Sequence, residues 1–155
     1  MSDEQIGAIL TKGPEDWQIV QQDSAGKGRM ALEGRWVSET PGRVEVRLAC
    51  EATGAPVTAA LDWQSAETMD NHKWSAVLQD IPAGGLYRLE TRFHTADNLA
   101  GEWSTRGDMR HFLGVGDLWV IAGQSNSAGY GRGPYEDGPE LGVHVLRNDE
   151  HWALA

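Results

Sequence analysis

Strand-like segments alternate with clusters of turn residues through the first 113 residues, and this pattern constrains the fold more than any other feature. The clearest segment is 43–51 (RVEVRLACE), where Val44, Val46 and Leu48 alternate with polar or small residues. A period of two is typical of an antiparallel strand with one buried face. We expect strands over the segments 17–22, 29–37, 43–51, 57–63, 73–79, 86–93 and 108–113.

Strands of this number and spacing predict an antiparallel β-sandwich, of the jelly-roll or immunoglobulin-like kind. The composition can support its core, because 40% of the 155 residues are hydrophobic and only 23% are charged. The residues expected inside the sandwich are Val44, Val46, Leu48, Leu78 and Leu89.

The sequence changes character at Gly114. Residues 118–122 (LWVIA) form an apolar run without alternation, which is typical of a strand buried on both faces of a parallel α/β sheet, with Trp119 in the core. Only two short strand-like segments follow, at 143–147 and 152–154. These elements are too few to complete an α/β sheet. We therefore interpret residues 1–113 as an N-terminal β-sandwich domain and 114–155 as the start of a second, truncated domain.

Ser125 follows this apolar run directly. A serine placed where a buried strand turns sharply into a helix can act as a nucleophile, provided that a base accepts its proton and backbone N–H groups stabilise the oxyanion. Gly123 permits such a turn. The spacing is not Gly-x-Ser-x-Gly, because position 127 is Ser. The plainer interpretation is a polar loop in which Ser125 or Asn126 caps a helix.

Residues 116–126 (GDLWVIAGQSN) resemble the first sequence block of the SGNH hydrolases, and in particular of the sialate O-acetylesterase-like branch. In that family a β-sandwich precedes the catalytic domain. Trp74, Ala83-Gly84-Gly85 and Tyr87 are similar to residues that often precede the block. The sequence departs from many members at Ser127, where they carry Met, and at Leu86, where they carry Pro.

The resemblance implies that Ser125 is the catalytic nucleophile and that its own backbone N–H is one oxyanion donor. Gly123, Gln124 and Asn126 would shape the turn, and no cofactor would be needed. The family takes its other oxyanion donors from a later Gly and a later Asn, and its base from a later Asp-x-x-His. None of these is present in the 155 residues, since Leu141 and Asn148 stand three residues before the two histidines of the tail, His144 and His151. We therefore expect the chain itself to be inactive.

The loop 128–142 would follow the nucleophile and rim its site. Arg132 and Tyr135 are the candidate substrate contacts within it. Seven tryptophans also invite a sugar-stacking interpretation, but those in predicted strands are expected in the core. Only Trp103 and Trp152 are placed freely enough to meet a ligand.

The composition argues against several kinds of partner, metal site and cellular location. The net charge of −10 argues against nucleic acid and anionic membranes as partners. The single cysteine, Cys50, excludes a cysteine-based zinc site, and the five histidines lack ligand spacing, so we expect no metal. No apolar run is long enough to span a bilayer, and the N-terminus lacks the basic start of a secretory signal. A cytoplasmic protein is the expectation.

Two functions remain open. The first is the N-terminal part of a carbohydrate O-acetylesterase that hydrolyses acetyl esters on sialic acid or a related sugar by serine acyl transfer. The second is a non-catalytic β-sandwich module that binds a carbohydrate or a protein. In either case, exposure of the apolar run 118–122 to water would be unfavourable. The segment 114–155 is therefore expected to pack on its own sandwich or to associate with a second copy of the chain.

Overall fold

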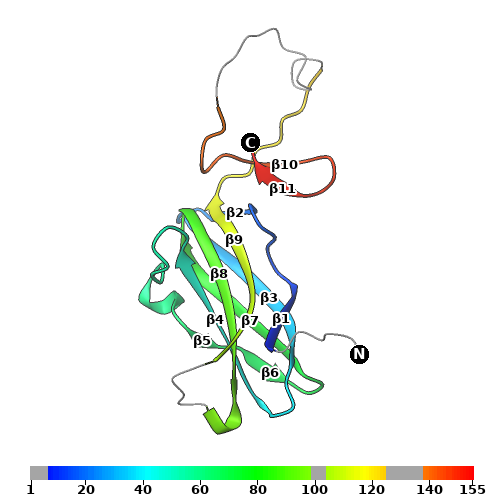
Figure 1. Ribbon diagram of the computed structural model, residues 1–155. Helices are drawn as coiled ribbons and strands as arrows, with labels where there is room; N and C mark the ends of the chain where they lie inside the picture. Colours follow the sequence, from blue (N-terminus) through cyan, green and yellow to red (C-terminus); the bar gives the residue numbers. More distant parts are fainter. Residues whose placement is uncertain (1–6, 99–103, 125–137) are drawn as a thin grey trace.

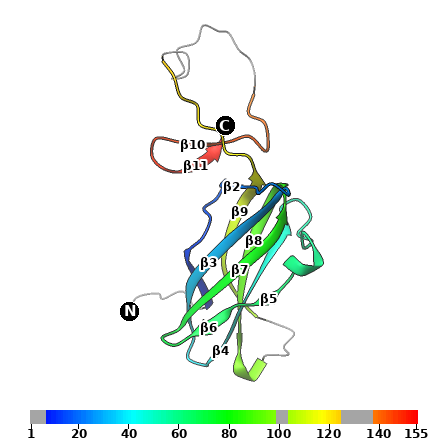
Figure 2. The ribbon, with the colours of Figure 1, turned by 180° about the vertical axis from the view of Figure 1, so that it is seen from behind.

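The structure is a computed structural model that describes residues 7–98, 104–124 and 138–155 (Figures 1 and 2). Within these ranges the chain is mainly β. The strands are β1 (Gly7–Lys12), β2 (Ile19–Gln21), β3 (Lys27–Val37), β4 (Gly42–Cys50), β5 (Gln64–Ser65), β6 (Glu67–Met69), β7 (Lys73–Pro82), β8 (Gly84–Thr95), β9 (Thr105–Gly116), β10 (His144–Leu146) and β11 (Trp152–Leu154). Two short 3-10 helices, η1 (Ala59–Leu61) and η2 (Ala96–Asn98), lie between strands.

Nine strands form two packed sheets, which confirms the predicted β-sandwich. One sheet has the order β1-β3-β7-β6 and the other β2-β9-β8-β4-β5. Neighbouring strands are antiparallel except at one edge, where β2 runs parallel to β9 and Ile19 pairs with Gly114. With the strands taken in chain order, this arrangement is that of an immunoglobulin-type sandwich.

A tyrosine at one end of the sandwich supports the same assignment. Tyr87 lies near the start of β8, and its hydroxyl donates a hydrogen bond to the carbonyl oxygen of Pro82 at 2.8 Å. Such a contact, from a tyrosine at this corner to the backbone a few residues upstream, is a hallmark of immunoglobulin-type sandwiches. Burial, aided by the nearby Cys50, raises the pKa of Tyr87, so the hydroxyl keeps its proton.

The core lies between the two sheets, and the alternation seen in the sequence selects it. Val44, Val46, Leu48, Leu78 and Leu89 are all fully buried, as predicted. Trp74 and Phe93 are the largest fully buried side chains. The buried cluster runs from Ala8 to Val115, so the sandwich encloses its own core without the segment that follows.

Two strand predictions within the sandwich needed correction. The segment 57–63 is not a strand, because it contains the 3-10 turn η1, which buries Leu61 while its two alanines stay exposed. The turn lies within the connection from β4 to its neighbour β5 in the same sheet, and the chain crosses to the other sheet only after β5. The segment 7–12, for which no strand was expected, forms β1; its sequence GAILTK lacks a period of two.

The apolar run 118–122 is not a strand in the structure either. Strand β9 continues to Gly116, and residues 117–122 then extend away from the sandwich without a strand partner (Figure 1). Trp119 is therefore exposed, contrary to the expectation that it lies in a core. The physical reason is that this segment pairs with no strand of either sheet, so the described residues leave its side chains uncovered.

The last two predicted strands are present as a small hairpin. β10 and β11 pair antiparallel, with Val145 opposite Ala153, and they form a sheet separate from the sandwich (Figures 1 and 2). We refer to residues 117–155 as the tail. The described part of the tail contains no helix.

Candidate functional site

The tail is fixed to the sandwich at its root by a carboxylate. Two neighbouring amides, of Gln21 and Gln22 at the end of β2, donate hydrogen bonds to Asp117 Oδ1 at 3.2 and 3.1 Å. The backbone N–H of Leu118 donates in turn to Gln21 Oε1 at 2.8 Å. Because β2 is itself paired with β9, these contacts determine the direction in which the chain leaves the sandwich.

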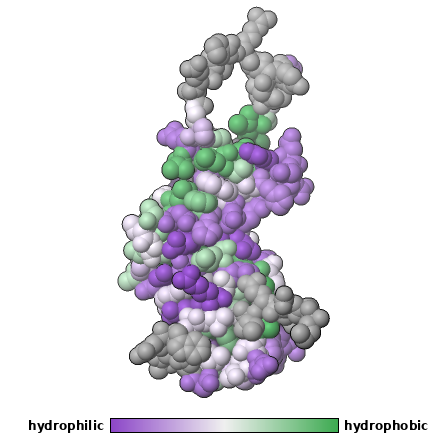
Figure 3. Space-filling view, viewed as in Figure 1, coloured by the Kyte–Doolittle hydropathy of each residue, from purple (hydrophilic) through white to green (hydrophobic). Residues whose placement is uncertain are grey.

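Large apolar side chains follow this anchored root. Leu118, Trp119, Val120 and Ile121 are exposed by 47, 84, 91 and 81%. The hairpin region adds Leu141, Val143, Val145 and Leu146, all exposed. Figure 3 shows apolar residues gathered at the foot of the tail, above a sandwich surface that is largely hydrophilic. A patch of this kind on a protein with a net charge of −10 is typical of a surface that another body covers.

The predicted site residues lie at the far end of this segment. Gly123 and Gln124 are exposed and lie in a bend without a strand partner. Ser125, Asn126, Arg132 and Tyr135 fall outside the residues that the structure describes, as does Ser127. The roles of the predicted site residues therefore stay predictions.

Two aromatic rings at the end of the sandwich support the hairpin. Trp17 and Phe112 stack with ring centroids 4.2 Å apart, and His144 packs edge-on against Trp17 at 5.3 Å. Both aromatic residues have a positive φ, 68° for Trp17 and 58° for Phe112, which is uncommon for bulky side chains. His144 Nδ1 lies 2.5 Å from the carbonyl oxygen of Trp17, so the imidazole donates through that nitrogen.

A second contact joins the hairpin to the same stretch of the sandwich. Glu15 accepts from His151 Nδ1 at 2.9 Å and from the backbone N–H of Trp152 at 3.3 Å. The hydrogen bond to Glu15 and the charge of that carboxylate raise the pKa of His151; its slight burial opposes this, and the charges of Asp149 and Glu150 add to the rise. Both tail histidines thus hold the hairpin on the sandwich through Nδ1.

Charged side chains cover the outer face of the five-stranded sheet, but they satisfy one another. Arg47 and Arg92 lie over the Trp63 ring, at 4.7 and 3.9 Å from its centroid. Glu90 accepts from Arg47 at 2.6 Å and from Arg88 at 2.7 Å. Burial acts to raise the pKa of Glu90, yet the hydrogen bonds and charges of the two arginines outweigh it and lower that pKa. The Trp63 ring is occupied by guanidinium groups, which leaves this face without an open sugar platform.

Tryptophans elsewhere divide between core and contact roles. Trp36 and Trp74 are buried in the sandwich, as expected, and Trp74 Nε1 donates to the carbonyl oxygen of Arg35 at 3.0 Å. Trp152 is half-buried in β11 against the sandwich. Trp103, the other candidate for a free ring, lies outside the described residues.

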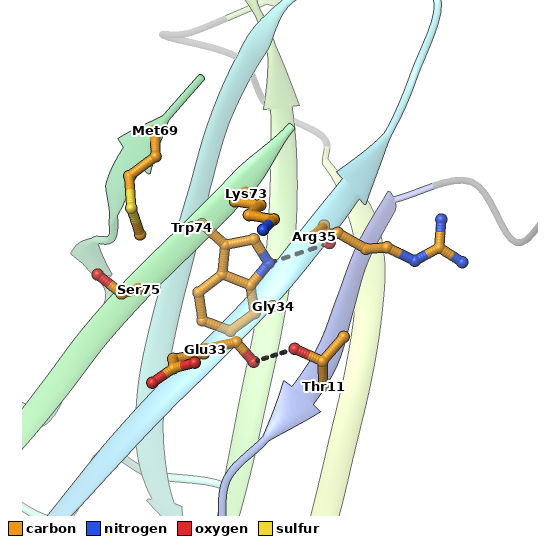
Figure 4. Close-up of a pocket in the computed structure, with 8 residues that line it drawn as sticks. All are labelled: Thr11, Glu33, Gly34, Arg35, Met69, Lys73, Trp74 and Ser75. Carbon is orange, nitrogen blue, oxygen red and sulfur yellow. Dashed lines mark hydrogen bonds between the residues drawn. The ribbon is translucent and has the colours of Figure 1, made fainter. Parts of the chain in front are cut away.

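Two shallow hollows open on the sandwich. One, of about 370 Å³, lies over the outer face of the four-stranded sheet and is lined by Thr11, Glu33, Gly34, Arg35, Met69, Lys73, Trp74 and Ser75 (Figure 4). The Arg35 side chain points away from it across β1, so its polar groups do not converge (Figure 4).

The second hollow lies where the tail leaves the sandwich. We call it the bulge hollow: it measures about 380 Å³ and is lined by Gln21, Gln22, Asp23, Lys27, Gly28, Arg29, Gln79 and Asp80. No sequence pattern predicts it, because β7 lies far along the chain from β2 and β3, which supply the rest of its lining. It shares Gln21 and Gln22 with the anchor of Asp117.

Among the described residues, no cluster of His, Cys, Asp and Glu could hold a metal ion. No helix in the same ranges is long and apolar enough to cross a membrane. Comparisons with protein-family models and with curated proteins found no match for the chain.

Proposed function

We propose that the chain is the N-terminal part of a carbohydrate O-acetylesterase of the SGNH type, with Ser125 as its nucleophile. The observation that carries the proposal is the exposed apolar segment 118–121, which follows the anchored Asp117 and precedes the sequence Gly123-Gln124-Ser125-Asn126. Its exposed side chains need a cover that the sandwich does not supply. Burying each of them would contribute about 1.5–3 kcal/mol. A surrounding α/β sheet would provide that cover and would hold the serine at the end of a central strand.

In the proposed reaction Ser125 Oγ attacks the acetyl carbonyl, the sugar hydroxyl leaves, and water then hydrolyses the acyl-enzyme. The backbone N–H of Ser125 stabilises the oxyanion. A base must accept the serine proton. The two tail histidines do not fill that role in this proposal, because both are engaged with the sandwich at Glu15 and Trp17. The base would come from an Asp-x-x-His in a longer gene product.

Kinetics on the product of the complete gene test this proposal. An O-acetylated sialic acid is the substrate, and release of acetate is the readout. Ser125→Ala should lower kcat/KM by at least about a thousandfold, because nucleophile and base act as a unit. The matched control is Ser127→Ala, two residues away, which should stay within a few-fold of the wild type. Equal activity of the Ser125→Ala variant would overturn the proposal.

The bulge hollow favours a second candidate function, a sandwich that binds carbohydrate without catalysis. Its lining is polar, and it lies on the folded part of the chain. The two functions are compatible, because a binding sandwich can deliver a substrate to a catalytic domain. An experiment can distinguish the two functions, because sugar binding by the sandwich does not require Ser125.

A further inference from the structure

We propose that the bulge hollow binds one ring of a neutral, polyhydroxylated sugar. The site lies on the sandwich, and its binding does not depend on Ser125. This proposal rests on the proposed esterase function in one respect only, the role of the sugar site beside a catalytic domain. Nothing in the sequence pattern points to this site; the geometry of strands β3 and β7 does.

A β-bulge shapes the hollow. Gly28 pairs with Ile81 and Met30 with Leu78, so that two residues of β7, Gln79 and Asp80, oppose one residue of β3, Arg29. The bulge breaks the alternation of β7, and both Gln79 and Asp80 are exposed on its outer side. Bulges of this kind redirect side chains and occur more often than expected beside functional sites.

Asp80 carries the strain of the bulge. Its φ is 54°, in the left-handed region that favours glycine. A non-glycine residue held in a sparsely populated conformation costs some stability. A glycine would fit this backbone without that cost. Aspartate is among the few non-glycine residues that adopt this conformation, and here it places a carboxylate at the hollow.

Four polar side chains in the bulge hollow have no partner among the described residues. Lys27, Arg29, Gln79 and Asp80 make no hydrogen bond or ion pair through their side chains within those ranges. Arg29 and Asp80 are of opposite charge and face each other across the bulge, yet no salt bridge joins them. Polar groups that converge on a hollow without satisfying each other are available to a ligand.

The chemistry of the lining selects a sugar. Two cations, Lys27 and Arg29, balance two carboxylates, Asp23 and Asp80, so a phosphate or a nucleic acid would meet repulsion as well as attraction. A pyranose ring with vicinal hydroxyls both donates and accepts: its hydroxyls donate to Asp80, and their oxygens accept from Arg29 and the Gln79 amide. Ligand pockets span roughly 300–1,000 Å³, and a hollow at the lower end suits a single ring.

The position of the hollow links it to the tail. Gln21 and Gln22 line the hollow and also hold Asp117 at the root of the tail. A sugar ring bound there lies beside the segment that leads to Ser125. The sandwich would thus hold part of a glycan next to the catalytic domain of the proposed esterase.

Amide NMR titration of the 155-residue chain with methyl β-galactopyranoside tests the proposal. We expect saturable shifts at Arg29, Gln79 and Asp80, with a dissociation constant in the millimolar range. Asp80→Gly should weaken binding about tenfold, because a charged hydrogen-bond partner is lost, while the melting temperature stays equal or rises. Lys73→Ala, which alters the other hollow, is the matched control and should bind as the wild type does.

Absence of saturable shifts, shifts confined to other surfaces, or unchanged binding by Asp80→Gly would overturn the proposal. Binding of inorganic phosphate in preference to the sugar would also overturn it. The Ser125→Ala chain should bind the sugar unchanged, so a failure here and a failure of the esterase proposal can be told apart.

Discussion

Gly34 lies where strand β3 passes over the indole of Trp74. A Cβ atom at this position would lie 2.2 Å from the carbonyl oxygen of Ile9 and 2.3 Å from the Trp74 ring. Neither neighbour can move freely, since one is backbone and the other is the largest fully buried side chain. We predict that Gly34→Ala lowers the free energy of unfolding by about 3 kcal/mol or more, measured by urea denaturation.

Gly116 provides the matched control for that substitution. It also lies in a strand, but the nearest atom to its Cβ position is Ile19 Cγ2 at 3.9 Å, an ordinary contact. Gly116→Ala should change the free energy of unfolding by less than about 1 kcal/mol. If the two variants lost equal amounts of unfolding free energy, Trp74 would not pack closely against Gly34 of β3 as described.

Single residues also show what the sequence could and could not predict. Val44, Val46 and Leu48 were placed in the core correctly, because their alternation with polar neighbours fixes which face is buried. The prediction that Trp119 lies in a core is wrong for this structure. An apolar side chain indicates that burial would be favourable, but it does not indicate which part of the protein buries it. Asp80 gave no signal, since its role depends on a register shift between strands distant in sequence.

At the scale of elements, the contacts that dock the β10–β11 hairpin on the sandwich include one ion pair that responds to pH, between His151 and Glu15. The carboxylate of Glu15 raises the pKa of His151 above its ordinary value of 6.5 when the hairpin is docked. A raised pKa in the docked form means that protonation favours docking. This contribution is present below the ordinary pKa and is lost as pH rises through the docked-state value.

We therefore predict that Glu15→Gln lowers the pKa of His151, measured by NMR titration of its imidazole. In the wild type, contacts between the hairpin and the sandwich should weaken as the pH rises through that pKa. Glu33→Gln removes a carboxylate that pairs with Lys12 elsewhere, and it should leave His151 unchanged. An identical His151 titration in the Glu15→Gln variant would contradict the contact.

Elements also differ in how far the sequence determines them. Strand β4 was predicted nearly residue for residue, because its pattern of burial is local. The run 118–122 has equally strong strand character but forms no strand, because a strand needs a neighbour to pair with. The turn η1 stands where a strand was predicted, because the segment connects β4 to its neighbour β5 and contributes only Leu61 to the core, a role that the segment's own pattern does not encode.

At the scale of the whole molecule, the tail presents an uncovered apolar surface on a self-contained sandwich. We predict that the 155-residue chain associates partly in solution through the segment 114–155, whereas a chain that ends at Gly116 stays monomeric. The reason is that an exposed apolar segment with unpaired backbone groups attracts partners. Size-exclusion chromatography with light scattering measures both. Replacing Val120 with Asp should reduce the association.

Strictly monomeric behaviour of both chains would contradict this prediction, especially if protease cleaves freely between Leu118 and Ala122. The tail would then be a linker and the sandwich a binding module. That result would leave the sugar site proposed for the bulge hollow untouched, because the hollow is built by the sandwich alone apart from the anchor at Asp117.

The central claim is that Ser125 is an acyl-accepting nucleophile whose base lies outside these 155 residues. Covalent labelling with a fluorophosphonate, followed by peptide mass spectrometry, tests it most directly. The product of the complete gene should carry a single adduct, on Ser125. The 155-residue chain should react no faster than its Ser125→Ala variant, since an unassisted hydroxyl stays protonated. Labelling of a different serine in the complete product, or rapid labelling of Ser125 in the 155-residue chain, would contradict the claim.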